Sequence, residues 1–128
     1  MLPKLYRLRK ERDFKILVQQ GKSFFLKELG LKYLKNNLDY SRFGFVVSTK
    51  IDKRATVRNK IKRRLREIIY QNLKKIKLGF DILILTRPEI KKLDFRQIKE
   101  ILEKIFIKLD LFQNHKLRAL NNCETLSA

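Results

Sequence analysis

The densest group of chemically useful side chains lies in residues 53–66, which read KRATVRNKIKRRLR; eight of the fourteen are basic and none is acidic. At 100° per residue, Val57, Ile61, Leu65 and Ile68 fall on one side of a helix and form an apolar stripe. Four basic residues follow one another at four-residue intervals along its edge: Arg54, Arg58, Lys62 and Arg66. Like charges at that spacing destabilise an isolated helix by about 0.2 to 0.5 kcal/mol per pair, a repulsion that a phosphate backbone would relieve. The pattern predicts a helix that buries one side and binds a polyanion beside it.

Two other interpretations of this basic helix have to be weighed. A charge run is commonly plain solvated surface, but this one has no interspersed Asp or Glu, and the chain carries 32 Lys and Arg against 13 Asp and Glu, a formal net charge of +19. A basic amphipathic helix can also lie on an anionic membrane. The stripe contains no Trp or Phe, however, and strand-like segments flank the helix, so a core is expected to use its apolar side. A nucleic-acid partner is the favoured interpretation.

The side chains of this helix suit different parts of a nucleic acid. Arginine donates paired hydrogen bonds to phosphate oxygens, whereas lysine supplies a point charge. The orientation of the protein on the phosphates would be fixed by Arg54, Arg58, Arg63 and Arg66. Electrostatic attraction of the nucleic acid would be increased by Lys60 and Lys62. Asn59 has two open roles, because its amide can bond to a ribose hydroxyl, a base edge or backbone, or can cap the start of a helix.

A second candidate surface combines aromatic and polar side chains from the N-terminal half of the chain. Its members are Phe14, Tyr33, Phe43, Phe45, Lys32, Ser48 and Lys50. Rings interleaved with basic residues can stack single-stranded bases, at about 1 to 3 kcal/mol per base. Aromatic residues on strands belong to a core more often, so on the residues alone the core interpretation is favoured.

No residues are arranged for catalysis by the protein itself. The chain has no Gly-rich phosphate loop, no nucleophile elbow and no Cys or His set at metal-ligand spacing. His115, the only histidine, is expected on the surface, and Cys123, the only cysteine, is expected to be a free thiol in a reducing cytoplasm. Without a secretory signal or an apolar run of about 18 residues, the chain is expected to be soluble and to have no membrane partner. If it takes part in a reaction, another molecule does the chemistry.

The elements that position these side chains follow from periodicity and turn residues. The expected elements are a helix over residues 13–20 ended by Gly21, strands over 29–35 and 42–48, the basic helix over 55–77 ended by Gly79, a strand over 81–86, and a helix after Asp94. The first two strands are expected to form an antiparallel pair. The strand over 81–86 is almost wholly apolar, which favours a central position with both faces buried.

The last helix and the overall class can be read in the same way. Asp94 and Gln97 are spaced as a capping box, and the core-facing residues of the helix are expected to be Phe95, Ile98, Leu102, Ile105 and Leu109. The length of 128 residues predicts a single domain over 1–112, followed by a frayed tail over 113–128. The class is α+β, with helices covering a small sheet.

Four segments, in order, resemble the bacterial ribonuclease P protein family. Residues 58–63, RNKIKR, with Arg54 ahead and Arg66-Glu67 behind, resemble the arginine-rich signature RNRxKRxxRE. The segments LRKERDF followed by QQGKS, SRFGFVVSTK and GFDILILTRP resemble the opening helix and two strands of the same family. The resemblance covers roughly residues 5–110.

The resemblance implies a protein subunit of an endoribonuclease whose RNA subunit removes the 5′ leader from precursor tRNA. It implies magnesium ions held mainly by that RNA, none bound tightly by the protein, and no catalytic residue in the protein. The fold implied has the order α-β-β-β-α-β-α, a small mixed sheet of about four strands and a left-handed βαβ crossover. Residues facing the catalytic RNA would be Arg54, Arg58, Asn59, Lys60, Lys62, Arg63 and Arg66. Residues lining a cleft for the leader would be Phe14, Val18, Lys32, Ser48 and Lys50.

The chain departs from the family pattern at a few positions. Lys60 stands where Arg is usual, which keeps the charge and loses the paired geometry. Val18 and Lys32 stand where many relatives carry aromatic residues, so leader contacts at these positions would involve less stacking. The loop over 50–56 lacks a glycine that some members have.

Two other functions share the charge of this chain. A ribosome-associated protein or RNA chaperone would lack both the leader cleft and the catalytic partner. A DNA-binding protein could use residues 55–77 as a recognition helix, but no helix-turn-helix partner precedes them, so no DNA partner is expected.

Overall fold

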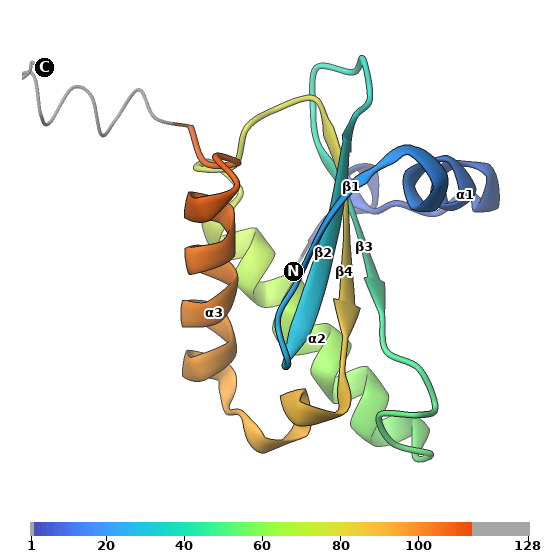
Figure 1. Cartoon of the computed structure of the whole chain (residues 1–128), viewed down its shortest axis with the longest axis vertical. Helices are drawn as coiled ribbons and strands as arrows, with labels where there is room; N and C mark the ends of the chain where they lie inside the picture. The colour runs from blue at the N-terminus through green and yellow to red at the C-terminus, as the bar shows by residue number, and fades with distance from the viewer. Residues whose placement is uncertain (1, 114–128) are drawn as a thin grey trace, which may run out of the picture.

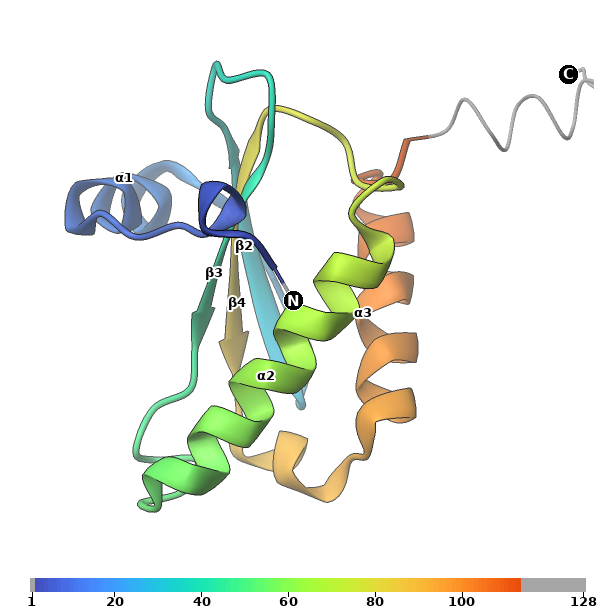
Figure 2. The same cartoon turned by 180° about the vertical axis from the view of Figure 1, so that it is seen from behind.

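The computed structural model of the chain describes residues 2–113, and His115, Cys123 and nearly all of the expected tail over 113–128 lie outside them. A four-stranded sheet carries one helix on one face and two helices on the other (Figures 1 and 2). The elements are α1 (Glu11–Gln20), β1 (Lys22–Phe25), β2 (Leu29–Lys35), β3 (Arg42–Val46), α2 (Ala55–Asn72), β4 (Phe80–Thr86) and α3 (Phe95–Lys108), with short 3₁₀ helices η1 (Lys4–Tyr6) and η2 (Pro88–Lys92). This order confirms the α+β class and the sequence of helices and strands expected above.

The strand order is β1-β2-β4-β3, with β4 antiparallel to β2 and parallel to β3. Residues 81–84 of β4 are buried, which confirms a central strand covered on both faces. The expected antiparallel pairing of the segments 29–35 and 42–48 is wrong, because β4 lies between them. A run that is apolar on both sides is most stable where both faces are covered, and this position separates β2 from β3. The first strand, β1, was not among the expected ranges.

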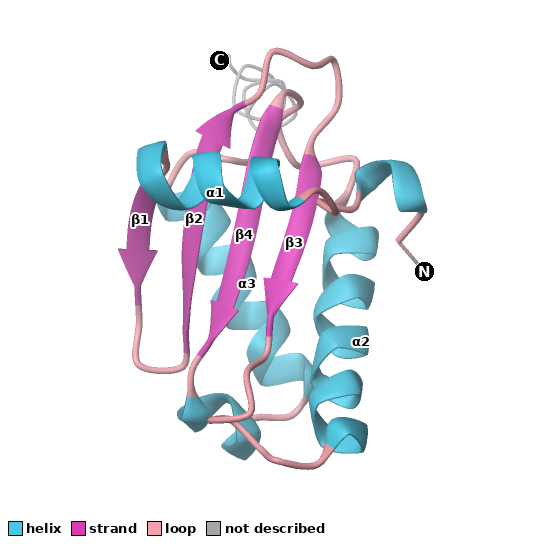
Figure 3. Cartoon of the chain, turned by 90° about the vertical axis from the view of Figure 1, so that its right-hand side faces the viewer, coloured by secondary structure: helices cyan, strands magenta, loops and turns pink. Residues whose placement is uncertain are grey.

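The connection from β3 through α2 to β4 is left-handed. Figure 3 views the sheet from the side of α1, with β3 and β4 running downward, β4 to the left of β3 and α2 behind the sheet. When this view is rotated in its plane so that both strands run upward, β4 lies to the right of β3. The chain then passes from β3 to β4 through a helix behind the sheet, which is the left-handed arrangement. Connections of this kind are right-handed in about 98% of cases. The crossover implied by the family resemblance is therefore confirmed against the general rule.

The larger core lies between the sheet and the helices α2 and α3. The apolar stripe of α2 is confirmed, because Ile61, Leu65 and Ile68 are buried. The capping box of α3 is confirmed as well, since the backbone N–H of Gln97 donates to Asp94 Oδ1 at 2.9 Å and the N–H of Asp94 donates to Gln97 Oε1 at 3.0 Å. The core side of α3 buries Ile98, Leu102, Ile105 and also Phe106, which was not on the expected list.

Helix α2 ends at Asn72, five residues before the expected end at Lys77. The buried side chain of Asn72 donates to the carbonyl of Ile68 at 2.9 Å, and the backbone N–H of Lys77 donates to Leu111 at 2.7 Å instead of to the helix. Gly79 has a φ of +85°, a region that favours glycine, and it belongs to the turn into β4 and not to a helix cap. The chain after Asn72 is therefore bound to the end of α3 and does not extend the basic helix.

Candidate nucleic-acid interface

The start of α2 is tied to the loop that follows β3 through Asp52. This carboxylate, only 7% exposed, accepts hydrogen bonds from Arg54 Nε and Nη2 at 3.0 Å each and lies 3.0 Å from Lys91 Nζ. Hydrogen bonds from Arg54, and then from Lys91, hold the pKa of Asp52 well below its ordinary value. Arg54 keeps 72% of its side chain exposed, so it is oriented by Asp52 and still faces solvent.

The middle of the basic helix combines a half-buried arginine, Arg58, with exposed polar side chains. Arg58 Nη1 donates to the backbone carbonyls of Asp52 at 3.0 Å and Lys53 at 2.8 Å, which fixes the direction of its guanidinium. The helix begins at Ala55 after Arg54, so Asn59 lies one turn inside it and the capping alternative is wrong. Three of the expected RNA-facing residues are exposed in this stretch: Asn59, Lys60 and Arg63.

At the C-terminal end of the row, Lys62 and Arg66 are half-buried, as Arg58 is. Both line a cavity of about 340 Å³ at the outer edge of β3, together with residues that precede α1. Arg66 therefore does not extend the open row, although its spacing placed it there. Burial, and then the positive charge of Arg7, lower the pKa of Arg66.

The five expected cleft residues form three groups. Phe14 of α1 lies against β3 at Gly44, where a Cβ atom would come within 2.8 Å of the Phe14 ring, so only glycine permits this approach. Val18, 49% exposed, accepts a hydrogen bond through its carbonyl from Lys32 Nζ at 3.2 Å. Ser48 and Lys50 lie in the loop after β3, where the Lys50 N–H donates to Ser48 Oγ at 3.3 Å.

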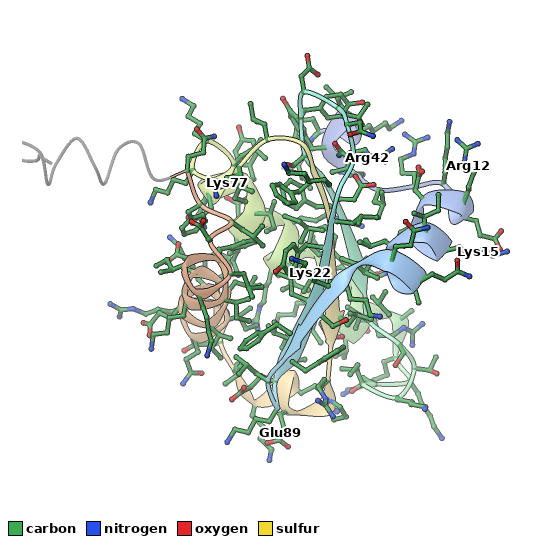
Figure 4. The ribbon with its side chains drawn as sticks, turned by 45° about the horizontal axis from the view of Figure 1, so that its top comes forward. Arg12, Lys15, Lys22, Arg42, Lys77 and Glu89 are labelled. Atoms are coloured by element: carbon green, nitrogen blue, oxygen red, sulfur yellow. The ribbon has the colours of Figure 1, made fainter. Side chains whose placement is uncertain are left out.

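Helix α1 crosses one face of the sheet, and only part of that face is covered (Figure 3). Its inner side packs through Leu17 onto Leu83 of β4, whereas Arg12 and Lys15 point away from the sheet (Figure 4). Lys32 bonds to α1 and so lies on the same face. The described residues therefore bring Phe14, Val18 and Lys32 to one side of the sheet, while Ser48 and Lys50 lie beyond the end of β3.

A row of side chains that the sequence did not identify continues this face. The register pairs Phe25 with Gly30, Gly30 with Leu85, and Leu85 with Val46, so these residues cross all four strands at one level. They lie on the side of Lys32, because residues two apart on a strand share a face. Phe25 is 48% exposed and Val46 is 37% exposed, which leaves an apolar floor open beside α1. Alternation alone could have placed Phe25, but only the register joins it to Val46.

Other aromatic residues of the second candidate surface belong to the core. Phe43 is 1% exposed, and Tyr33 and Phe45 are half-buried against the same cluster. The core interpretation, favoured on the residues alone, is confirmed for Phe43. Among residues 2–113, no group of three or more His, Cys, Asp and Glu side chains could hold a metal ion, and no helix is long and apolar enough to cross a membrane.

Comparison with known proteins identifies the family. The family model described as Ribonuclease P matches residues 2–110. The ribonuclease P protein component of Thermotoga maritima is 40% identical over 108 residues, which is 81% of this chain and 92% of the relative. That of a Synechocystis species is 39% identical over 106 residues, covering 82% of this chain and 86% of the relative.

Solved structures agree with this assignment. The Staphylococcus aureus RNase P protein superimposes with a TM-score of 0.78 and 31% identity, over 84% of this chain and 98% of that one. The Thermotoga maritima RNase P protein in complex with 1-(4-fluorophenyl)-2-thiourea gives a TM-score of 0.72 and 41% identity, over 77% and 95%. This chain therefore belongs to the ribonuclease P protein family, which supplies the protein subunit of the endoribonuclease that matures the 5′ ends of tRNA.

Proposed function

We propose that this protein binds the catalytic RNA of ribonuclease P through the outer side of α2 and the 5′ leader of precursor tRNA across the open face beside α1. The observation that carries the proposal is the folded basic helix. Its apolar stripe is used by the core, and the rest of its N-terminal half carries basic side chains with no acidic residue among residues 53–66. Binding to RNA would lower the repulsion along this row and release counterions from the phosphates.

The helix contacts would come from the seven residues expected from the signature. They are Arg54, Arg58, Asn59, Lys60, Lys62, Arg63 and Arg66. The hydrogen bonds of Arg54 and Arg58 to the loop over 48–53 support this role, because a guanidinium that is already oriented loses less conformational freedom when it binds phosphate. Asn59 has its amide on the exposed side of the helix, where a ribose hydroxyl or a base edge can reach it.

The leader would lie on the face that α1 crosses. Phe14, Val18 and Lys32 would contact it near α1, and Ser48 and Lys50 would contact it beyond β3. The open floor made by Phe25, Leu85 and Val46 adds apolar surface on which unstacked bases can rest. Phe25 supplies an aromatic ring on the face where Val18 and Lys32 replace the aromatic residues of many relatives.

The RNA subunit would perform the cleavage, with magnesium ions that the RNA mainly holds. A protein of net charge +19 between two polyanions lowers their repulsion, so it would raise both the affinity for precursor tRNA and the occupancy of magnesium at low concentration. The protein would act in the cytoplasm, where bacterial precursor tRNA is made. It would orient and retain the substrate without touching the scissile bond.

The test is cleavage of a precursor tRNA by a bacterial ribonuclease P RNA at low magnesium, with and without this protein. Cleavage restored at the mature 5′ end is expected, and the variant Arg96→Gln, changed at an exposed residue of α3, is expected to restore it equally well. Tight RNA binding without restored cleavage, and without preference for leader-bearing over mature tRNA, would instead support a ribosome-associated protein or an RNA chaperone.

A further inference from the structure

A cavity joins residues 4–9, which have been given no role above, to Lys62 and Arg66 of α2. It lies at the outer edge of β3 and has a volume of about 340 Å³. Five basic residues and no acidic residue line it: Lys4, Arg7, Arg9, Lys62 and Arg66. Its remaining wall is apolar and includes Phe14. Three of its five cations therefore come from residues 4–9, which the arginine-rich signature does not include.

One buried donor of the cavity is left without a partner in the described part of the protein. Arg66 Nε is buried and has no hydrogen-bond partner among the described residues. A buried donor left unpaired costs about 1 to 3 kcal/mol. Arg7 uses its Nε to bond the carbonyl of Leu2 at 2.9 Å, which directs its guanidinium and leaves its terminal amines available.

The charges of the cavity repel one another. Arg7 and Arg66 both line this cavity, and no carboxylate does. Burial, and then the charge of Arg7, lower the pKa of Arg66, as this arrangement would require. An anion in this space would accept hydrogen bonds from both and remove the repulsion. A phosphodiester supplies the charge and the oxygen acceptors, and the adjacent Phe14 ring supplies a surface for the sugar or base.

We propose that this cavity binds one phosphodiester group of RNA, so that residues 4–9 and the C-terminal half of α2 form a single RNA-binding site. This inference rests on the proposed function and extends it to Lys4, Arg7 and Arg9. The phosphate comes either from the catalytic RNA, since Lys62 and Arg66 belong to the basic row, or from the leader, since Phe14 belongs to the proposed cleft.

The test compares the unchanged protein with four variants: the double variant Lys4→Gln with Arg9→Gln, the single variant Arg7→Gln, the control Arg96→Gln, and Arg58→Ala, which tests the helix interface. Lys4 and Arg9 are exposed, so the double variant removes two charges without disturbing the core and keeps the test sound if Arg7→Gln unfolds. The dissociation constant for a bacterial ribonuclease P RNA is measured over a range of KCl concentrations. The same proteins are then assayed for the affinity of the assembled enzyme for precursor and mature tRNA.

The expected result is that each lost phosphate contact reduces the slope of log K against log salt by about 0.7 to 0.9. A change in binding to the catalytic RNA alone identifies that RNA as the source. A change confined to the ratio between precursor and mature tRNA identifies the leader. If both variants behave like Arg96→Gln while Arg58→Ala weakens RNA binding, the cavity is not a phosphate site and the proposed function stands. If Arg58→Ala also has no effect, the helix interface itself is wrong.

Discussion

At the scale of single residues, Arg58 is the best test of the helix interface. Its guanidinium is half-buried, and Nη1 donates to two loop carbonyls, which fixes its direction. Arg58→Ala should weaken binding to the catalytic RNA and reduce the slope of log K against log salt by about 0.7 to 0.9, since one phosphate contact is lost. Arg58→Lys keeps the charge and should retain most of the slope. An unchanged slope in Arg58→Ala would mean that this side of α2 does not face phosphates.

Phe14 and Phe25 test the leader face. Phe14→Ala and Phe25→Ala should each reduce the preference for leader-bearing over mature tRNA, by up to about 1 to 3 kcal/mol where a base stacks on the ring. Assembly with the catalytic RNA should be unchanged. The control is Ile107→Ala, which removes an exposed apolar side chain from α3, away from the leader face. Equal losses of affinity for mature and precursor tRNA would exclude the leader face.

The sequence predicts single residues well where one element determines their position. Spacing alone identified the stripe and the row of α2, because both depend only on the helical repeat. Spacing did not show that Arg66 turns into a cavity with Arg7, because that contact joins segments nearly sixty residues apart. The connection of Phe25 to Val46 was missed for the same reason: these residues lie on opposite edge strands, and only the register across four strands places them in one line.

At the scale of elements, an ion-pair network fixes α1 on the sheet. Arg42 Nη2 donates to Asp81 Oδ2 at 2.7 Å and Arg42 Nη1 donates to Asp13 Oδ2 at 3.1 Å, and the hydrogen bond to Asp81 raises the pKa of Arg42. Asp13→Asn weakens a charged hydrogen bond, which typically contributes about 1.5 to 3 kcal/mol. We expect lower thermal stability and a smaller preference for leader-bearing tRNA.

The control for Asp13→Asn is binding to the catalytic RNA through Arg54 and Arg58, because these residues bond to the loop after β3 and not to α1. Its dependence on salt should match that of the unchanged protein. If the preference for leader-bearing tRNA also stays the same, the position of α1 does not control the leader face.

Asp52 connects three segments, and its connection depends on pH. The pKa of its carboxyl lies below the ordinary value of 3.8 in the folded protein, so the ionised group stabilises the fold above about pH 4 and loses this effect as the pH falls. Asp52→Asn should therefore lower the melting temperature at pH 7. The difference in melting temperature from the unchanged protein should begin to shrink between about pH 5 and pH 3, a range of about one unit on either side of the ordinary carboxyl pKa. A difference that is constant with pH would assign the loss to packing instead of charge.

The boundaries of elements were predicted where local signals end them. The capping box located the start of α3. The chain after Asn72 is instead held by a backbone hydrogen bond from Lys77 to Leu111, a contact between distant segments that helical periodicity does not contain. The apolar run of β4 predicted its burial correctly. It did not predict that β4 would separate β2 from β3, because pairing depends on the whole sheet.

At the scale of the whole molecule, stability rests on the core between the sheet and its two helices. Ile84→Ala, at a fully buried position of β4, should lower the free energy of unfolding by about 2 to 5 kcal/mol, through lost burial and the cavity left behind. Ile107→Ala, at a position 63% exposed, should change it by less than about 0.5 kcal/mol. Denaturant unfolding measures both. Similar losses in the two variants would contradict the assignment of the core.

The general features of the molecule were accessible from the sequence, but its handedness was not. Charge and periodicity predicted an α+β protein with a helix that packs one side on the core and presents basic side chains beside it. The left-handed crossover followed only from the family resemblance, since the physical rule for parallel strands predicts the opposite hand.

The central place of β4 also determines which parts of the protein can assemble while the chain is being synthesised. A nascent chain that ends before Phe80 contains β2 and β3 with no strand to join them, and α1 lacks the Leu83 side chain on which it packs. The basic helix is complete in such a chain, at Asn72, while the face proposed for the leader does not yet exist. All residues of the basic helix are therefore made before β4, and the face that would let the protein tell a precursor from a mature tRNA is assembled only when that last strand arrives.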